Sequence, residues 1–154
     1  SNCGMHAMDI MRMESGFLHW GHDISPEENQ YQAGLSFTIS SKKGIDFVGK
    51  EALENIKNNK IKDRFAMFTL KQSKPGEPLL LHDEPIYLED KIIGRSTSGN
   101  YSFNFKTNLV FGYIENKFTN EELKSKNLFI EVEKKKYPII IQSQPLKRTD
   151  FKNL

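Results

Sequence analysis

The sequence predicts an α+β protein in which helices come first and short strands follow. In the first 60 residues, apolar side chains recur at helical spacing in two segments. After residue 63, short apolar runs alternate with turns rich in Gly, Pro, Asp and Lys. Several short strands at this spacing indicate a small sandwich or barrel. With 154 residues, the chain can hold one medium domain, or a small domain and part of another.

The first predicted element is a helix over residues 4–15, ended by Gly16. At about 100° of rotation per residue, Glu14 falls on one arc with three apolar side chains, Ala7, Ile10 and Met11. Glu14 also lies in the last turn, where the helix dipole disfavours a carboxylate. Because it departs from two local preferences, we expect Glu14 to be a site residue. The alternatives are a structural ion pair elsewhere in the fold, or solvent around the frayed helix end.

Two further elements are predicted before residue 60. Residues 35–40 alternate apolar and polar side chains, which is typical of a strand. Residues 48–58 place their apolar side chains on one side and predict a second helix. The polar run from Asn58 to Asp63 carries no core residue. We expect the boundary between the two parts of the chain there.

The second part is predicted to consist of short strands. They are expected at residues 64–71, 85–88, 92–97, 109–114, 128–133 and 137–142. Polar tips at residues 89–91 and 134–136 indicate two hairpins. Thr119, followed three residues later by Glu122, predicts a capping box at the start of a short helix.

Composition excludes several classes of protein. The net charge is +2 and the basic residues are spread along the chain, so we expect no binding to nucleic acid or to a membrane surface. No apolar run approaches the length of a transmembrane helix. The single cysteine, Cys3, excludes an internal disulfide. We expect a segment of a longer polypeptide, located in the cytoplasm, or in the mitochondrial matrix if the source is eukaryotic.

Two motifs suggest sites that we do not expect to exist. His19 and His22 have a spacing seen among metal ligands, but the segment is irregular and no further His or Cys cluster completes a tetrahedral site. The run from Gly94 to Gly99 superficially resembles a phosphate-binding loop. It lacks the Lys-Ser/Thr ending and a following helix, so we expect a strand and a bend instead.

Several segments together resemble the glycine-cleavage T-protein (aminomethyltransferase) family. They are Arg12-Met13-Glu14-x-Gly16, the segment WGHDISP at 20–26, Ala33-Gly34-Leu35 and the segment DFVGKEAL at 46–53. Residues 94–99 and 109–114 resemble the C-terminal barrel of the same family. In amino-acid sequence, the chain most resembles the folate domain of dimethylglycine and sarcosine dehydrogenases. The resemblance covers nearly the whole chain.

The resemblance implies a fold in two parts. Residues 3–60 would be the later part of the folate-binding core, a remnant of ferredoxin-like α/β units. Residues 63–154 would be the C-terminal Greek-key β-barrel. The complete protein would transfer a one-carbon unit from an aminomethyl or N-methyl donor to tetrahydrofolate. The family's proton-handling aspartate lies in the N-terminal half, so we expect no catalytic residue in this chain and no activity from it alone.

The resemblance also implies three folate-binding residues. Glu14 corresponds to the carboxylate that anchors the pterin, whose adjacent N–H and NH2 groups suit bidentate pairing. Lys42 and Phe151 are the nearest matches to a basic and an aromatic residue that contact folate, although the family usually has Arg and Tyr there. Lys42 would meet the glutamate tail as a point charge, and Phe151 would stack; a solvated turn lysine and a capping aromatic are the alternatives. Phe17 and Trp20 would form flat walls of the site or, alternatively, core.

Three kinds of parent protein remain open. The first is a T-protein that works with a lipoyl carrier protein. The second is a flavin dehydrogenase of the dimethylglycine or sarcosine type, with FAD in an upstream domain and this chain as its folate-binding tail. The third is a non-catalytic interaction module of the same fold. In the first two cases, the expected partners are folate and an upstream domain of the same polypeptide.

Overall fold

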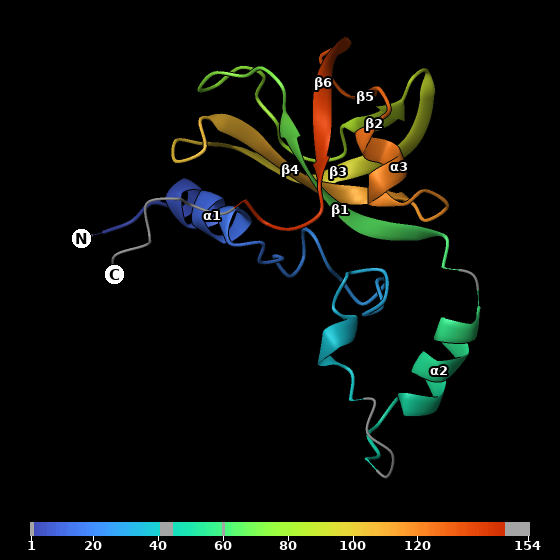
Figure 1. Cartoon of the computed structure of the whole chain (residues 1–154). Coiled ribbons are helices and arrows are strands. Elements are labelled where there is room, and N and C mark those ends of the chain that lie inside the picture. The colour runs from blue at the N-terminus through green and yellow to red at the C-terminus, as the bar shows by residue number, and fades with distance from the viewer. Residues whose placement is uncertain (1, 41–44, 60, 147–154) are drawn as a thin grey trace.

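A computed structural model describes residues 2–40, 45–59 and 61–146 of the chain (Figure 1). Two helices and a 3-10 turn come first: α1 (Met5–Glu14), η1 (Ser36–Thr38) and α2 (Lys50–Asn58). The strands are β1 (Asp63–Leu70), β2 (Pro85–Leu88), β3 (Lys91–Ser102), β4 (Thr107–Glu115), β5 (Leu128–Val132) and β6 (Lys135–Gln142), with helix α3 (Asn120–Lys124) before β5. The predicted α+β class with a β-barrel is confirmed.

The six strands form a closed antiparallel barrel in the order β1-β4-β3-β2-β5-β6. Strand β1 closes it, because Phe68 lies opposite Val110 of β4 on one side and opposite Ile141 of β6 on the other. The register of β3 against β4 shifts between Ser96 and Ser98. Such a bulge increases the local twist of a strand and redirects its side chains.

The barrel interior is the main hydrophobic core. Phe68, Ile86, Ile114 and Ile130 are each at most 1% exposed. Burying a side chain of this kind contributes about 1.5–3 kcal/mol. The core forms because inward positions of the strands are apolar at a spacing of two residues, as the sequence pattern indicates.

Helix α1 covers part of the outer face of the barrel. Met13 is 2% exposed and packs in a second cluster with Leu109 and Phe111 of β4. Phe65 and Met67 of β1 join this cluster from the outer face. Each face of β1 is thus covered, one by the barrel interior and the other by the second cluster. This explains why the side chains on both faces of β1 are apolar.

The buried side of α1 differs from the predicted arc. Ile10 and Met13 face the second cluster, whereas Ala7 is exposed and Met11 is 52% exposed. The helix carries apolar residues on both sides, and the barrel covers only one of them. Rotation per residue alone therefore does not identify the packed side.

The strand predicted at residues 35–40 is wrong, because η1 occupies this segment. The backbone N–H of Thr38 donates to Leu35 O, and the hydroxyl of Thr38 donates to the same carbonyl. No described strand lies beside this segment to pair with it. Alternation of polar and apolar residues does not make a strand without such a partner. The second predicted helix is confirmed as α2, which Figure 1 shows standing apart from the barrel.

The local turn predictions hold in the barrel. Both predicted hairpins form, and the β5–β6 tip places Glu133 and Lys134 at positive φ. The capping box at Thr119 and Glu122 is present at the start of α3. The run from Gly94 to Gly99 lies inside β3 and is not a phosphate-binding loop. No described helix is both long enough and apolar enough to cross a membrane.

Candidate functional site

Glu14 is the last residue of α1, and the barrel holds its carboxylate. The hydroxyl of Ser102 donates to Oε1 at 2.5 Å, and the side-chain amide of Asn104 donates to Oε2 at 2.7 Å. Both donors belong to the β3–β4 hairpin. Ser102 is buried, whereas Asn104 is exposed and Glu14 is half-buried. The carboxylate is therefore fixed from the barrel side.

Two aromatic side chains near the end of α1 are exposed. Phe17 is 67% exposed and Trp20 is 64% exposed. The alternative in which they are core residues is wrong for this chain, because neither lies against the barrel interior. Each presents a flat apolar surface to the outside.

The structure describes one of the three predicted site residues. Glu14 is placed together with Ser102 and Asn104, which sequence reasoning missed. Lys42 and Phe151 lie outside the described residues.

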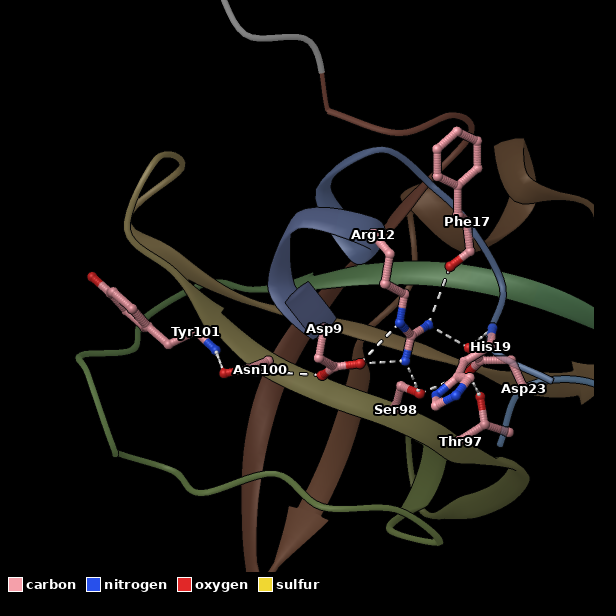
Figure 2. Close-up of polar contacts among 9 residues, drawn as sticks. All are labelled: Asp9, Arg12, Phe17, His19, Asp23, Thr97, Ser98, Asn100 and Tyr101. Carbon is pink, nitrogen blue, oxygen red and sulfur yellow. Dashed lines mark hydrogen bonds and ion pairs between the residues drawn. The ribbon is translucent and has the colours of Figure 1, made fainter. Parts of the chain in front are cut away.

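Two residues before Glu14, Arg12 forms an ion pair that joins α1 to the following loop (Figure 2). The guanidinium of Arg12 pairs with Asp23, whose side chain is 0% exposed. A second nitrogen of Arg12 donates to the hydroxyl of Ser98 at 2.8 Å. Arg12 also pairs with Asp9 one turn earlier in α1. The guanidinium thus connects the helix, the loop and strand β3.

Asp23 is fully hydrogen-bonded in this position. Its Oδ1 accepts from the hydroxyls of Thr97 at 2.5 Å and Ser98 at 2.8 Å, and its Oδ2 accepts from the backbone N–H of His19 at 2.9 Å. The hydroxyl of Tyr113 donates to the backbone carbonyl of Asp23 at 2.8 Å. Burial raises the pKa of the Tyr113 phenol, and the nearby negative charges of Glu28 and Asp23 raise it further. Both effects favour the protonated phenol, which is the form that donates to Asp23.

Alternate residues of β3 contact α1 along its length. Ser98 bonds to Arg12, Asn100 donates to Asp9 at 3.3 Å, and Ser102 bonds to Glu14. These positions share one face of the strand because side chains alternate with a period of two. The same alternation of Ser, Asn and Ser is visible in the sequence, and it is the signal by which the polar face could have been found.

All four histidines of the chain line one groove of about 350 Å³ between α1 and residues 79–82. They are His6, His19, His22 and His82. The rings of His19 and His22 stack with centroids 4.6 Å apart. Within the described ranges, no three His, Cys, Asp or Glu side chains are arranged to hold a metal ion.

A second cleft, of about 500 Å³, lies beside the end of α1. Phe17 and Phe37 line it together with Pro145 near the end of the described chain. Phe37 is 81% exposed. This cleft offers apolar walls of the kind that a ligand site needs.

Comparison with protein families matches both parts of the chain. The family described as "Glycine cleavage T-protein C-terminal barrel domain" matches residues 64–147, which is more than half of the chain. The family described as "GCVT N-terminal domain" matches residues 1–43.

Individual relatives are much longer than this chain. Mitochondrial dimethylglycine dehydrogenase of Homo sapiens is 31% identical over 97% of the chain, but only 16% of that protein is covered. The 4-methylaminobutanoate oxidase (formaldehyde-forming) of Paenarthrobacter nicotinovorans is 42% identical over 64% of the chain and 12% of its own length. The chain thus spans about one-sixth or less of these two relatives.

A solved structure has the same fold. It is the glycine cleavage system aminomethyltransferase T from Bartonella henselae, which aligns with a TM-score of 0.74 at 22% sequence identity. The alignment covers 90% of this chain and 37% of that protein.

Proposed function

Because the chain belongs to the glycine-cleavage T-protein family, we propose that it forms one wall of a tetrahydrofolate site in a longer enzyme. That enzyme would transfer a one-carbon unit from an aminomethyl or N-methyl donor to tetrahydrofolate. The observation that carries the proposal is the Glu14 carboxylate, which two barrel side chains hold at the end of α1. The dehydrogenase and the oxidase that match this chain are themselves enzymes.

The chemistry of Glu14 suits a pterin. A carboxylate has about four lone-pair sites, and each Glu14 oxygen accepts one hydrogen bond from the barrel. The remaining sites can accept the adjacent N–H and NH2 groups of a pterin as a charge-assisted pair. Exposed Phe17 and Trp20 supply flat apolar surfaces near the same helix end. In this proposal Lys42 and Phe151 contact the rest of the folate.

The chain supplies binding groups rather than the whole reaction. In our proposal, residues 3–60 complete the folate-binding core and residues 63–154 form the barrel. The outer side of α1 carries Met5, Met8 and Met11, which are 71%, 50% and 52% exposed. Such an apolar face fits a covering domain of the same polypeptide. The proton-handling residue would come from that upstream part.

Glu14→Gln in the full-length polypeptide tests the proposal. The variant keeps the size of the side chain but replaces one acceptor oxygen with a donor. Losing a charge-assisted pair should cost about 1.5–3 kcal/mol, or about ten- to a hundredfold in affinity for tetrahydrofolate by calorimetry. Glu121→Gln is the matched control, because Glu121 is an exposed glutamate of α3 that pairs with Lys124.

Two results would contradict this assignment. If Glu14→Gln binds tetrahydrofolate as tightly as the unchanged protein, Glu14 is not the anchor. If the 154-residue chain binds tetrahydrofolate at micromolar concentration by itself, the site does not need an upstream wall. We expect weak or no binding by this chain and no catalysis.

A second candidate is the folate-binding tail of a flavin-dependent dehydrogenase. The dimethylglycine dehydrogenase match favours it, because it is 31% identical over 97% of this chain, whereas an aminomethyltransferase of Synechococcus elongatus is 26% identical over 95%. In such a parent an upstream domain would hold FAD and oxidise an N-methyl amine. The flavin absorption spectrum of the purified full-length protein distinguishes this parent from a T-protein, which would depend on a lipoyl carrier protein instead. A full-length protein that binds neither folate nor flavin would favour the non-catalytic interaction module.

A further inference from the structure

We propose that Ser102 of the barrel is a positioning residue for Glu14, so that the barrel sets the orientation of the carboxylate before a ligand arrives. This inference rests on the proposed folate site. The contact joins the two family segments: Glu14 lies in residues 1–43 and Ser102 in residues 64–147.

The direction of the hydrogen bond from Ser102 is fixed by its surroundings. Its Oγ accepts the backbone N–H of Phe105 at 3.0 Å, and its hydroxyl proton is directed to Glu14 Oε1 at 2.5 Å. Ser102 is 0% exposed, so water does not compete for this hydroxyl. The side chain is thus a dedicated donor to Glu14.

The backbone that carries Ser102 is well anchored. Ser102 pairs with Thr107 across the β3–β4 ladder, at the start of the hairpin tip. From the same tip, Asn104 donates to the other Glu14 oxygen. One short, regular hairpin therefore holds both carboxylate oxygens, which restrains rotation of the Glu14 side chain.

The rest of β3 prevents α1 from sliding along the barrel. Ser98 holds Arg12, two residues before Glu14, and Arg12 is in turn paired with buried Asp23. A shift of the helix would break the Arg12 and Glu14 contacts together. A carboxylate held in this way loses little conformational freedom when a ligand binds, and such preorganisation increases affinity.

Four variants of the full-length polypeptide test this role by calorimetry with tetrahydrofolate. Ser102→Ala should weaken binding on the order of fivefold, the worth of one hydrogen bond. Ser102→Thr keeps the hydroxyl and should restore most of the affinity. Ser102→Ala combined with Glu14→Gln should bind no more weakly than Glu14→Gln alone, because Ser102 acts through Glu14.

Ser96→Ala is the matched structural control. Ser96 lies in the same strand, is 0% exposed and donates its hydroxyl to Glu84. This variant removes a buried serine–glutamate contact away from Glu14. It should lower stability as Ser102→Ala does, while leaving the affinity for tetrahydrofolate unchanged.

A measurement without ligand gives a second readout. In the 154-residue chain, the carbon-13 chemical shift of the Glu14 carboxylate should change in Ser102→Ala and stay unchanged in Ser96→Ala. If Ser102→Ala alters neither this signal nor the affinity while Glu14→Gln weakens binding, the positioning role is wrong and the folate site stands. Additive losses in the double variant also overturn the role. If Glu14→Gln has no effect, the proposed site and the role of Ser102 both fail.

Discussion

Arg12 and Asp23, eleven residues apart in the chain, form an ion pair in which the aspartate side chain is 0% exposed and the arginine side chain 14%. Burying two charges is costly unless hydrogen bonds satisfy them. Here the hydroxyls of Thr97 and Ser98 complete the Asp23 carboxylate. The pair therefore depends on the barrel, and it attaches α1 and the loop that follows α1 to strand β3.

Asp23→Asn should destabilise the protein by about 3 kcal/mol, because it removes the buried counter-charge of the Arg12 guanidinium and leaves only the more exposed Asp9 to pair with it. Urea unfolding of the 154-residue chain measures this loss. The control is Asp83→Asn, which breaks an Arg–Asp pair with Arg95 whose side chains are 63% and 56% exposed. An exposed pair contributes at most about 1 kcal/mol. Equal losses in the two variants would contradict the role assigned to burial.

The capping box of α3 should make stability depend on pH. Hydrogen bonds from the backbone N–H and then the hydroxyl of Thr119 lower the pKa of Glu122 below its ordinary value of 4.5. Glu122 therefore binds a proton less readily in the folded state than in the unfolded state. Its contribution to the free energy of unfolding is complete above pH 4.5 and is lost as the pH falls through the pKa of the folded state.

Glu122→Gln should therefore reduce the loss of unfolding free energy between pH 4.5 and more acidic conditions. Urea unfolding at a series of pH values measures the profile. Thr119→Ser keeps a hydroxyl donor and should retain the wild-type slope, whereas Thr119→Ala should lose part of it. An unchanged slope in Glu122→Gln would show that the cap does not contribute.

Proteases should cut the chain first between Asn58 and Asp63. Helix α2 contains no buried residue and ends at Asn58, and β1 begins at Asp63. This polar stretch lies between a helical segment and the barrel, and boundaries of this composition are where chains are cut most readily. Limited digestion with a protease of broad specificity, followed by mass spectrometry, should yield a resistant C-terminal piece. Early cleavage between Leu109 and Ile114, inside β4, would contradict the stability of the barrel.

His19 and His22 should bind no metal. Their rings stack face to face at an interplanar angle of 24° rather than converging on one point, and a structural zinc site needs four ligands. Elemental analysis of the purified protein without an affinity tag should find no stoichiometric zinc or iron. One equivalent of either metal would overturn this expectation.

The sequence predicted the barrel strands well because their signals are local. Apolar inward positions and turn residues at the tips identify five of the strands within a few residues. Strand β3 is longer than its predicted 92–97, reaching Ser102. Its second half is polar because Asn100 and Ser102 face α1. A strand whose outer face binds polar groups of another element shows no apolar alternation.

The site was less accessible to sequence reasoning because its contacts are distant in the chain. Glu14 stood out through its local context, but its partner Ser102 lies 88 residues away. Likewise, Asp23 accepts hydrogen bonds from Thr97 and Ser98, which lie 74 and 75 residues later in the chain. Local patterns identified the charged residue in each case and could not identify what satisfies it.

Closure of the barrel has a consequence for the behaviour of the protein at high concentration. Each of the six described strands has a neighbour on both sides, so none of them is an edge strand of an open sheet. Unpaired edges are where chains add to one another in amyloid-like growth. The apolar surfaces of α1 can therefore attract other molecules only through side chains, and self-association through them would leave the β-structure intact.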